Sequence, residues 1–268
     1  MSKLYDLAAD EYETFVINQR FKNPAKETAN IINELAHQDS KLLDVGTGSG
    51  IVLSEIRQLN PHLELFGLDN SFEVLELARK KGFELLIKSS LPNLPFLDNS
   101  FDFVTANFVL SHIDQYEKTI QEISRIIVPN GYFVFTSWGS GQKEYNKLFY
   151  NKVIDFISPE EHDRIIKQHL PNEELFEDNN SLTNILSKNN FKITKQYTKQ
   201  YQLDLTLSDY LNCRFNLLIG KHMKKVLSPT LWEQFQQEMS AAFQEKVGQE
   251  ITYKGNVDFF ICKLESQV

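Results

Sequence analysis

Leu42-Leu43-Asp44-Val45-Gly46-Thr47-Gly48-Ser49-Gly50 is the stretch of this 268-residue sequence that decides the fold. The apolar run at Lys41–Val45 predicts a short buried strand, and apolar positions at helical spacing predict a helix over residues 49–58. The glycines between them allow a tight turn and a close approach of the backbone to a ligand. Because a helix N-terminus presents unpaired N–H groups, this loop is a candidate site for an anionic group.

Short apolar runs alternate with helical segments after this loop, which is typical of a parallel sheet built from strand–helix–strand units. Ser71 is expected to cap the helix after the second strand. Asn130-Gly131 is expected to form a tight turn before the fifth strand, because both residues tolerate positive φ. The predicted strands span residues 41–45, 63–68, 83–87, 101–106 and 132–137.

The flanking sequence predicts helices and two further strands. Two helices are expected before residue 41, and Ser158-Pro159 and Ser228-Pro229 each predict a helix start, with Ser208 as a further candidate cap. Residues 191–203 and 251–264 are the expected last strands. The expected parts are an N-terminal helical lid at 1–40, a core at 41–137, a helical insertion at 138–180, and the end of the core sheet at 181–268 with a helical insertion at 205–250.

Composition limits the classes of partner. The chain has 28 basic and 36 acidic residues, a net charge of −8, so its overall field repels phosphate backbones and anionic lipids. The N-terminus does not resemble a secretory signal, and no apolar stretch approaches the roughly 18 to 20 residues that cross a bilayer. Cys213 and Cys262 have neither a disulfide-framework nor a metal-ligand spacing. We therefore expect a cytoplasmic protein with no metal, nucleic-acid or membrane partner.

The spacing of the glycines argues against a dinucleotide site. A dinucleotide fingerprint has a glycine or alanine five positions after the first glycine, but position 51 is Ile51 and the third glycine is Gly50. Asp69, at the end of the second strand, can accept hydrogen bonds from both ribose hydroxyls of an adenosine. An acid that merely begins the next helix is the structural alternative.

Four segments in order carry a family resemblance. They are the glycine loop at 44–50, Asp69, the stretch Leu94-Pro95-Phe96-Leu97-Asp98-Asn99-Ser100-Phe101-Asp102, and Val109-Leu110-Ser111-His112-Ile113 followed by residues 122–131. Residues 41–138 thereby resemble the class I S-adenosylmethionine-dependent methyltransferases, and particularly the small-molecule group that includes ubiquinone and menaquinone biosynthesis enzymes. Val128, Asn130 and Ser90 depart from the family pattern, which has an acid at the position of Ser90.

The resemblance implies an α/β fold: a Rossmann-like, mostly parallel seven-stranded sheet with an antiparallel last strand, helices on both faces and helical lid insertions. It also implies S-adenosyl-L-methionine as cofactor, bound across the carboxyl ends of the first, second and fourth strands, and S-adenosyl-L-homocysteine as product. The positions that it assigns to the cofactor are Asp44, Gly46, Thr47, Gly48, Gly50, Asp69, Asn70, Ser90, Leu91, Asn107 and Phe108.

Methyl transfer from a sulfonium chiefly requires orientation of two reactants, and a base is needed only where the acceptor carries a proton. His112 is the candidate base, with a packing or capping role as its alternative. Candidate contacts to an apolar or aromatic small-molecule acceptor are Tyr5, Tyr12, Trp138 and Tyr145. A homodimer is compatible with the sequence. The alternative functions are a catalytically silent S-adenosylmethionine-binding regulatory protein and, with less support, a nicotinamide-dependent oxidoreductase.

Overall fold

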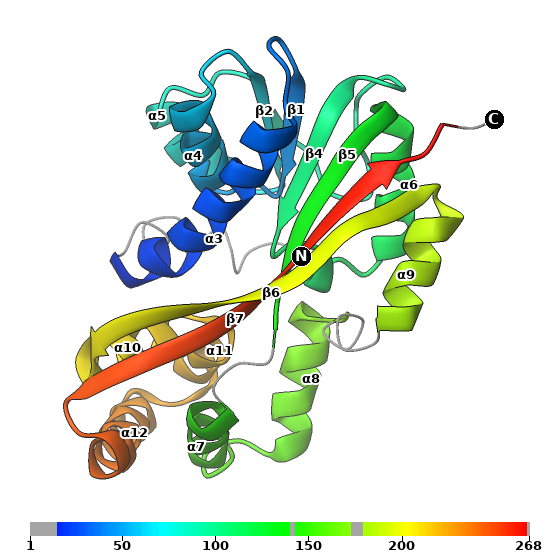
Figure 1. The fold of residues 1–268 in the computed structure, drawn as a ribbon. Helices are drawn as coiled ribbons and strands as arrows, with labels where there is room; N and C mark the ends of the chain where they lie inside the picture. Colours follow the sequence, from blue (N-terminus) through cyan, green and yellow to red (C-terminus); the bar gives the residue numbers. More distant parts are fainter. Residues whose placement is uncertain (1–14, 140–142, 173–178, 267–268) are drawn as a thin grey trace.

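A seven-stranded sheet with the order β3-β2-β1-β4-β5-β7-β6 runs through the molecule in the computed structural model, which describes residues 15–139, 143–172 and 179–266 (Figure 1). β7 is antiparallel to both of its neighbours, and the other pairs are parallel, so the expected fold class is confirmed. The strands are β1 (Lys41–Val45), β2 (Glu64–Asp69), β3 (Leu86–Lys88), β4 (Phe101–Asn107), β5 (Ile127–Trp138), β6 (Phe191–Thr206) and β7 (Glu250–Leu264).

Helices cover both faces of this sheet (Figure 1). On one face lie α3 (Phe15–Leu35), α4 (Ile51–Leu59) and α5 (Phe72–Lys80), and on the other lie α6 (Tyr116–Ile126) and α9 (Asn179–Lys188). The other helices of the described residues are α7 (Lys143–Val153), α8 (Pro159–His169), α10 (Leu207–Phe215), α11 (Leu218–Val226) and α12 (Pro229–Val247), and a 3₁₀ turn lies at Leu110–His112. Among the described helices, none combines the length and the apolar character needed to span a membrane.

Side-chain alternation along the strands explains this layering. Leu42 and Val134 are buried against α3 and α4, whereas Leu43, Phe133 and Phe135 are buried against α6 and α9. Successive side chains of a strand point to opposite faces, so a run that is apolar at every position requires helices on both sides. The sequence of the central strands therefore specifies a sheet that is buried on both faces.

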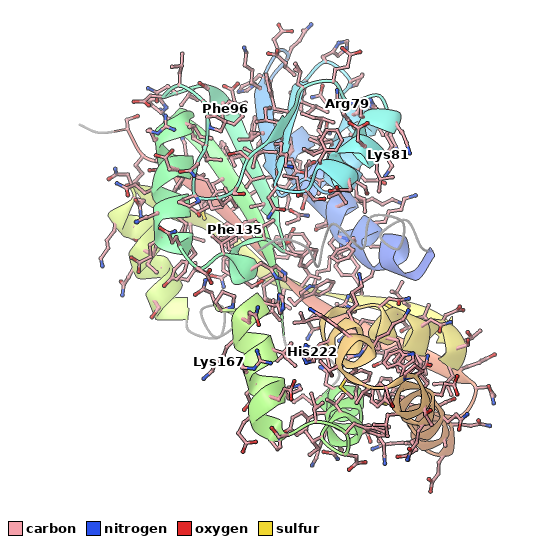
Figure 2. The ribbon with its side chains drawn as sticks, turned by 180° about the vertical axis from the view of Figure 1, so that it is seen from behind. Arg79, Lys81, Phe96, Phe135, Lys167 and His222 are labelled. Carbon is pink, nitrogen blue, oxygen red and sulfur yellow. The ribbon has the colours of Figure 1, made fainter. Side chains whose placement is uncertain are left out.

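β6 and β7 extend beyond the sheet and carry a separate helical lobe (Figure 1). β7 pairs with β5 only over residues 257–263 but with β6 over its whole length, so residues 200–206 and 250–256 form a two-stranded arm. Figure 2 shows Phe135 within the sheet and Lys167 and His222 in this lobe. The lobe core draws on α7, α8 and α10–α12 and includes Phe149, Val153, Ile165, Tyr210, Leu211, Met223, Phe235, Met239 and Phe243.

Both predicted helical insertions thus contribute to one core, while α9 instead packs on β6 and α6. The helix starts at Ser71, Ser158 and Ser228 are confirmed, because each serine oxygen accepts a hydrogen bond from the backbone N–H three residues later. The prediction that Ser208 caps a helix is wrong. Thr206 caps α10 instead, and its hydroxyl oxygen accepts a hydrogen bond from the Asp209 N–H at 3.1 Å.

The expected tight turn at Asn130-Gly131 is also wrong in part. β5 already begins at Ile127, and the strand register shifts opposite Phe101 and Phe103, so the two residues lie in an irregularity within the strand. Asn130 has the expected positive φ of 67°, but Gly131 does not. Glycine is required at 131 by packing, since a Cβ there would lie 2.6 Å from the Ile127 side chain.

Candidate functional site

A cavity of about 350 Å³ opens at the carboxyl ends of β1, β2 and β4. The strand order reverses between β1 and β4, and ligands of open α/β sheets bind in the crevice at such a switch point. The volume lies at the lower end of the range for small-molecule sites. All of the positions that the sequence assigned to the cofactor line this cavity, with the exception of Gly50.

The glycine loop forms one wall of the cavity. Gly46 and Gly48 have φ values of 68° and 55°, in the left-handed region that glycine adopts without strain. The N–H groups of Gly46 and Thr47 donate to the carbonyl of Leu68 at 2.7 and 3.0 Å, which ties the loop to the end of β2. Gly50 begins α4, and a Cβ there would lie 3.2 Å from the Phe83 ring, so this glycine serves helix packing.

Asp69 connects the glycine loop to the start of α5. Its Oδ2 accepts a hydrogen bond from the Gly48 N–H at 2.9 Å, and its Oδ1 accepts one from the Ser71 N–H at 3.0 Å. An ionised carboxylate only accepts hydrogen bonds, and these two bonds fix its orientation at the cavity wall. Asp69 lines the cavity beside Asn70.

Asp44 is a buried acid, only 1% exposed, at the floor of the same cavity. Burial raises its pKa to about 7, and the charge of Asp69 adds to this rise, while the hydroxyls of Thr105 and Thr47 oppose it. The Thr105 hydroxyl donates to Oδ1 at 2.7 Å. Oδ2 has no hydrogen-bond partner within the part of the chain that the structure describes. A buried oxygen of this kind is an acceptor position for a ligand donor.

The far end of the cavity is aromatic. The Phe108 ring stacks on the Trp138 ring at 4.1 Å between centroids, and Phe21 of α3 contacts both at 5.4 and 5.8 Å. Phe108 has a φ of 59°, a conformation that costs a bulky residue about 1–3 kcal/mol and that clusters at functional sites. Sequence reasoning found Trp138 and Phe108 but missed Phe21. The available signal was that Phe21 and Ala25 share one face of a helix, and both line the cavity.

His112 lies on the cavity wall in the 3₁₀ turn after β4. Its Nδ1 is 2.9 Å from the carbonyl oxygen of His169, so the neutral ring carries its proton on Nδ1, and Nε2 is the basic nitrogen. Burial lowers the pKa of His112, although the bond to His169 opposes the shift. The ring is therefore neutral at neutral pH. Asp114 and Gln115, which the sequence reasoning also missed, line the cavity just after this turn.

Asn70, Ser90, Leu91 and Asn107 complete the agreement between sequence and cavity. Asn107 Nδ2 donates to the Thr28 hydroxyl at 3.0 Å, which joins β4 to α3.

The structure does not bring Tyr145 to the cavity. Its ring packs on Tyr210 and Phe243 in the helical lobe, because α7 faces the lobe core. Tyr5 and Tyr12 lie outside the described residues, and within 15–139, 143–172 and 179–266 no acid, histidine and cysteine cluster could hold a metal.

Replacement of the loop glycines tests how closely the wall is packed. In Gly46→Ala the new Cβ would lie 2.5 Å from Val109 Cγ2, whereas no atom lies within 4 Å of the corresponding position in Gly48→Ala. Both variants suffer the backbone strain of positive φ, so the second is a matched control. We expect Gly46→Ala to have the lower Tm, by several degrees. Equal Tm values in differential scanning calorimetry would contradict this packing.

The titration of Asp44 predicts a pH effect on stability. Between the ordinary pKa of 3.8 and the folded value of about 7, the unfolded chain loses the proton that the folded chain keeps. Raising the pH from 5 to 7 should therefore lower the stability of the native protein by about 2 kcal/mol, roughly 4 to 8 °C in Tm, through this group. Asp44→Asn removes the titration, so its Tm relative to the native protein should rise over that interval. A constant difference in Tm would refute the assignment.

The comparisons with known proteins agree with this geometry. Residues 43–135 match the family model described as a methyltransferase domain. A demethylmenaquinone methyltransferase from Thermotoga maritima is 30% identical over 135 residues, which cover 49% of this chain and 58% of that protein. The chain thus spans little more than half the length of this curated relative.

Solved structures share the fold. The YcgJ protein from Bacillus subtilis has a TM-score of 0.56 at 16% identity, covering 90% of this chain and 99% of that one. Phosphoethanolamine N-methyltransferase 2 from Haemonchus contortus, in complex with S-adenosylhomocysteine, has a TM-score of 0.53 at 16% identity, covering 100% of this chain and 61% of that one. Residues 43–135 of this chain are thus similar to methyltransferase domains, and the chain shares its fold with a solved methyltransferase structure.

Proposed function

We propose that the chain binds S-adenosyl-L-methionine in the cavity of about 350 Å³ and transfers its methyl group to a small molecule. The observation that carries the proposal is the pairing of two acids at the carboxyl edge of the sheet. Asp44 presents a buried oxygen without a partner in the described residues, and Asp69 is held beside the glycine loop by two backbone N–H groups. These acceptors suit the two ends of an amino-acid nucleoside.

Two features of the cavity fit the amino-acid end of this cofactor. Asp44 Oδ2 can accept a hydrogen bond from the ammonium group, and that positive charge favours the ionised form of an acid whose pKa is about 7. Gly48 has open space on its cavity side, where a Cβ would meet no atom within 4 Å. The backbone of the loop can thus approach the ligand closely.

The nucleoside end has its own acceptors. Asp69 would accept from the ribose hydroxyls, and Asn70, Ser90 and Leu91 line the adjoining wall, where the adenine would lie. Ser90 offers a neutral hydroxyl in place of a carboxylate, so its contribution to affinity is smaller than that of Asp69. Ser89 also lines this wall, and its N–H donates to the Asp69 carbonyl at 3.0 Å.

When bound, the cofactor supplies an electrophilic methyl group on a positively charged sulfur. The protein then has to orient the acceptor and exclude water, which in favourable cases contributes on the order of 7 to 11 kcal/mol. Phe21, Phe108 and Trp138 offer apolar surface for an acceptor at one end of the cavity. Where the acceptor carries a proton, His112 is the base, because its neutral ring can receive that proton on Nε2.

Calorimetric titration and a transfer assay test this proposal together. We expect binding of S-adenosylhomocysteine, no binding of NAD, and transfer of a labelled methyl group from S-adenosylmethionine to a small molecule in a metabolite extract. Binding without any labelled product would favour the catalytically silent alternative. Binding of NAD alone would favour the oxidoreductase. Sizing by light scattering in the same samples would test the homodimer that the sequence allows.

Asp69→Asn should weaken the binding of S-adenosylhomocysteine by at least about tenfold, because a hydrogen bond to a charged group contributes about 1.5 to 3 kcal/mol. Asn preserves the size of the side chain but removes the charge. Asp98→Ala is the control, since Asp98 pairs with Arg125 at the surface and does not line the cavity. An unchanged affinity in folded Asp69→Asn, measured by calorimetry, would reject the ribose assignment.

A further inference from the structure

Arg20 of α3 is a cation at the back of the aromatic end of the cavity. Its guanidinium carbon lies 4.2 Å from the centroid of the Trp138 ring and 5.6 Å from that of Tyr253. Its Nε is buried and has no hydrogen-bond partner within the described residues. Stacking on aromatic faces is favourable for a guanidinium. It does not provide hydrogen-bond acceptors for the N–H groups, which point outward in the plane of the guanidinium. The Nε–H of Arg20 therefore needs an acceptor.

No carboxylate of the described chain supplies that acceptor. Arg20 forms no ion pair with the residues that the structure describes, and neither does Arg214, whose Nη1 donates to the neutral Asn146 side chain at 3.1 Å. Arg20 also forms a side-chain hydrogen bond with the neutral Cys213 thiol, and both arginines act electrostatically on Cys213 and Tyr210, so they lie in one region. In a chain of net charge −8, two arginines that have no acidic partner among the described residues favour an anion locally.

Tyr201 adds a second donor beside Arg20. The two residues line a small hollow together with Trp138 and Tyr253, and Tyr201 Oη is buried with no hydrogen-bond partner in the described part of the chain. Burial and the negative charge of Glu27 raise the pKa of Tyr201, so the hydroxyl keeps its proton. The hollow has a volume of about 10 Å³, enough for one water-sized group.

The hollow and the main cavity share one lining residue, Trp138, and Phe21, the residue after Arg20, also lines the cavity. The Trp138 ring lies between Phe108 and the guanidinium of Arg20, so a molecule that lies against Phe21 and Phe108 would have to extend past the edge of the indole to reach Arg20. Apolar surface is complementary to an apolar acid where polar donors lie beside it, and here these are the Arg20 Nε–H and the Tyr201 hydroxyl, which have no partner in the described residues.

We propose that Arg20 and Tyr201 bind a carboxylate of the methyl acceptor, and that the acceptor is an aromatic or apolar carboxylic acid. The inference rests on the proposed function, because it names the acceptor class of the same site. Two donors and a hollow for one small group suit a carboxylate oxygen. A phosphate carries more charge and three acceptor oxygens, so it needs more donors than this hollow presents.

Matched probes test the carboxylate directly. Calorimetry would measure 2-naphthoate, the neutral 2-naphthamide and 2-naphthyl phosphate against the full chain, with and without S-adenosylhomocysteine. We expect the native protein to bind 2-naphthoate at least about tenfold more tightly than the amide. Arg20→Met should remove this preference by weakening 2-naphthoate alone, and Arg20→Lys should restore part of it. Arg79→Met is the control, because Arg79 pairs with Glu76 at the surface.

Separate outcomes address the inference and the function on which it rests. Equal binding of 2-naphthoate and 2-naphthamide to the native protein, or no binding of 2-naphthoate at millimolar concentration, would overturn the inference. So would an Arg20→Met variant that loses both probes equally, since that result would mean a packing role. Tighter, Arg20-dependent binding of the naphthyl phosphate would overturn the choice of carboxylate. Failure of S-adenosylhomocysteine to bind, with the acid preference intact, would instead overturn the proposed function.

Discussion

The geometry of the cavity depends on the hydrogen bonds that the carboxylate of Asp69 accepts. One oxygen accepts from the Gly48 N–H and the other from the Ser71 N–H, so a single side chain at the end of β2 fixes both the glycine loop and the start of α5. The loop follows β1 and the helix follows β2, and parallel pairing of these strands brings the two segments to the same edge. The wall of the site is therefore set by sheet topology and held by one charged group.

This arrangement buries ionisable groups and thereby shifts their pKa values. Asp44 is protonated over part of the range in which a free aspartate is charged, because the floor of the cavity excludes water. His112 is likewise kept neutral by burial, and its Nδ1 is committed to the His169 carbonyl. Such groups are unfavourable for folding, and ionisable groups with shifted pKa values cluster at functional sites.

Trp138 contacts residues of the sheet, of the N-terminal helix α3 and of the arm formed by β6 and β7. It ends β5, stacks on Phe108 from β4, contacts Phe21 of α3, and lies beside Arg20 and the arm residue Tyr253. The helical lobe also reaches the site through the last residue of α8, whose carbonyl accepts from His112. The aromatic end of the cavity is thus built from segments far apart in the sequence, whereas the end at the glycine loop is built from consecutive strand–loop–helix units.

The sequence by itself determined the strand–helix alternation, the positions of β1, β2 and β4, the helix caps at Ser71, Ser158 and Ser228, and nearly every residue proposed for the cofactor. These features are local, since periodicity, capping and loop glycines act within a few residues. Only the tertiary structure decided that Tyr145 belongs to the lobe core, that Phe21 and Arg20 join Trp138, and that the arm of β6 and β7 carries the lobe. Those contacts form between segments whose separation along the chain leaves no periodic signal, and their choice depends on how the helices pack once the sheet is formed.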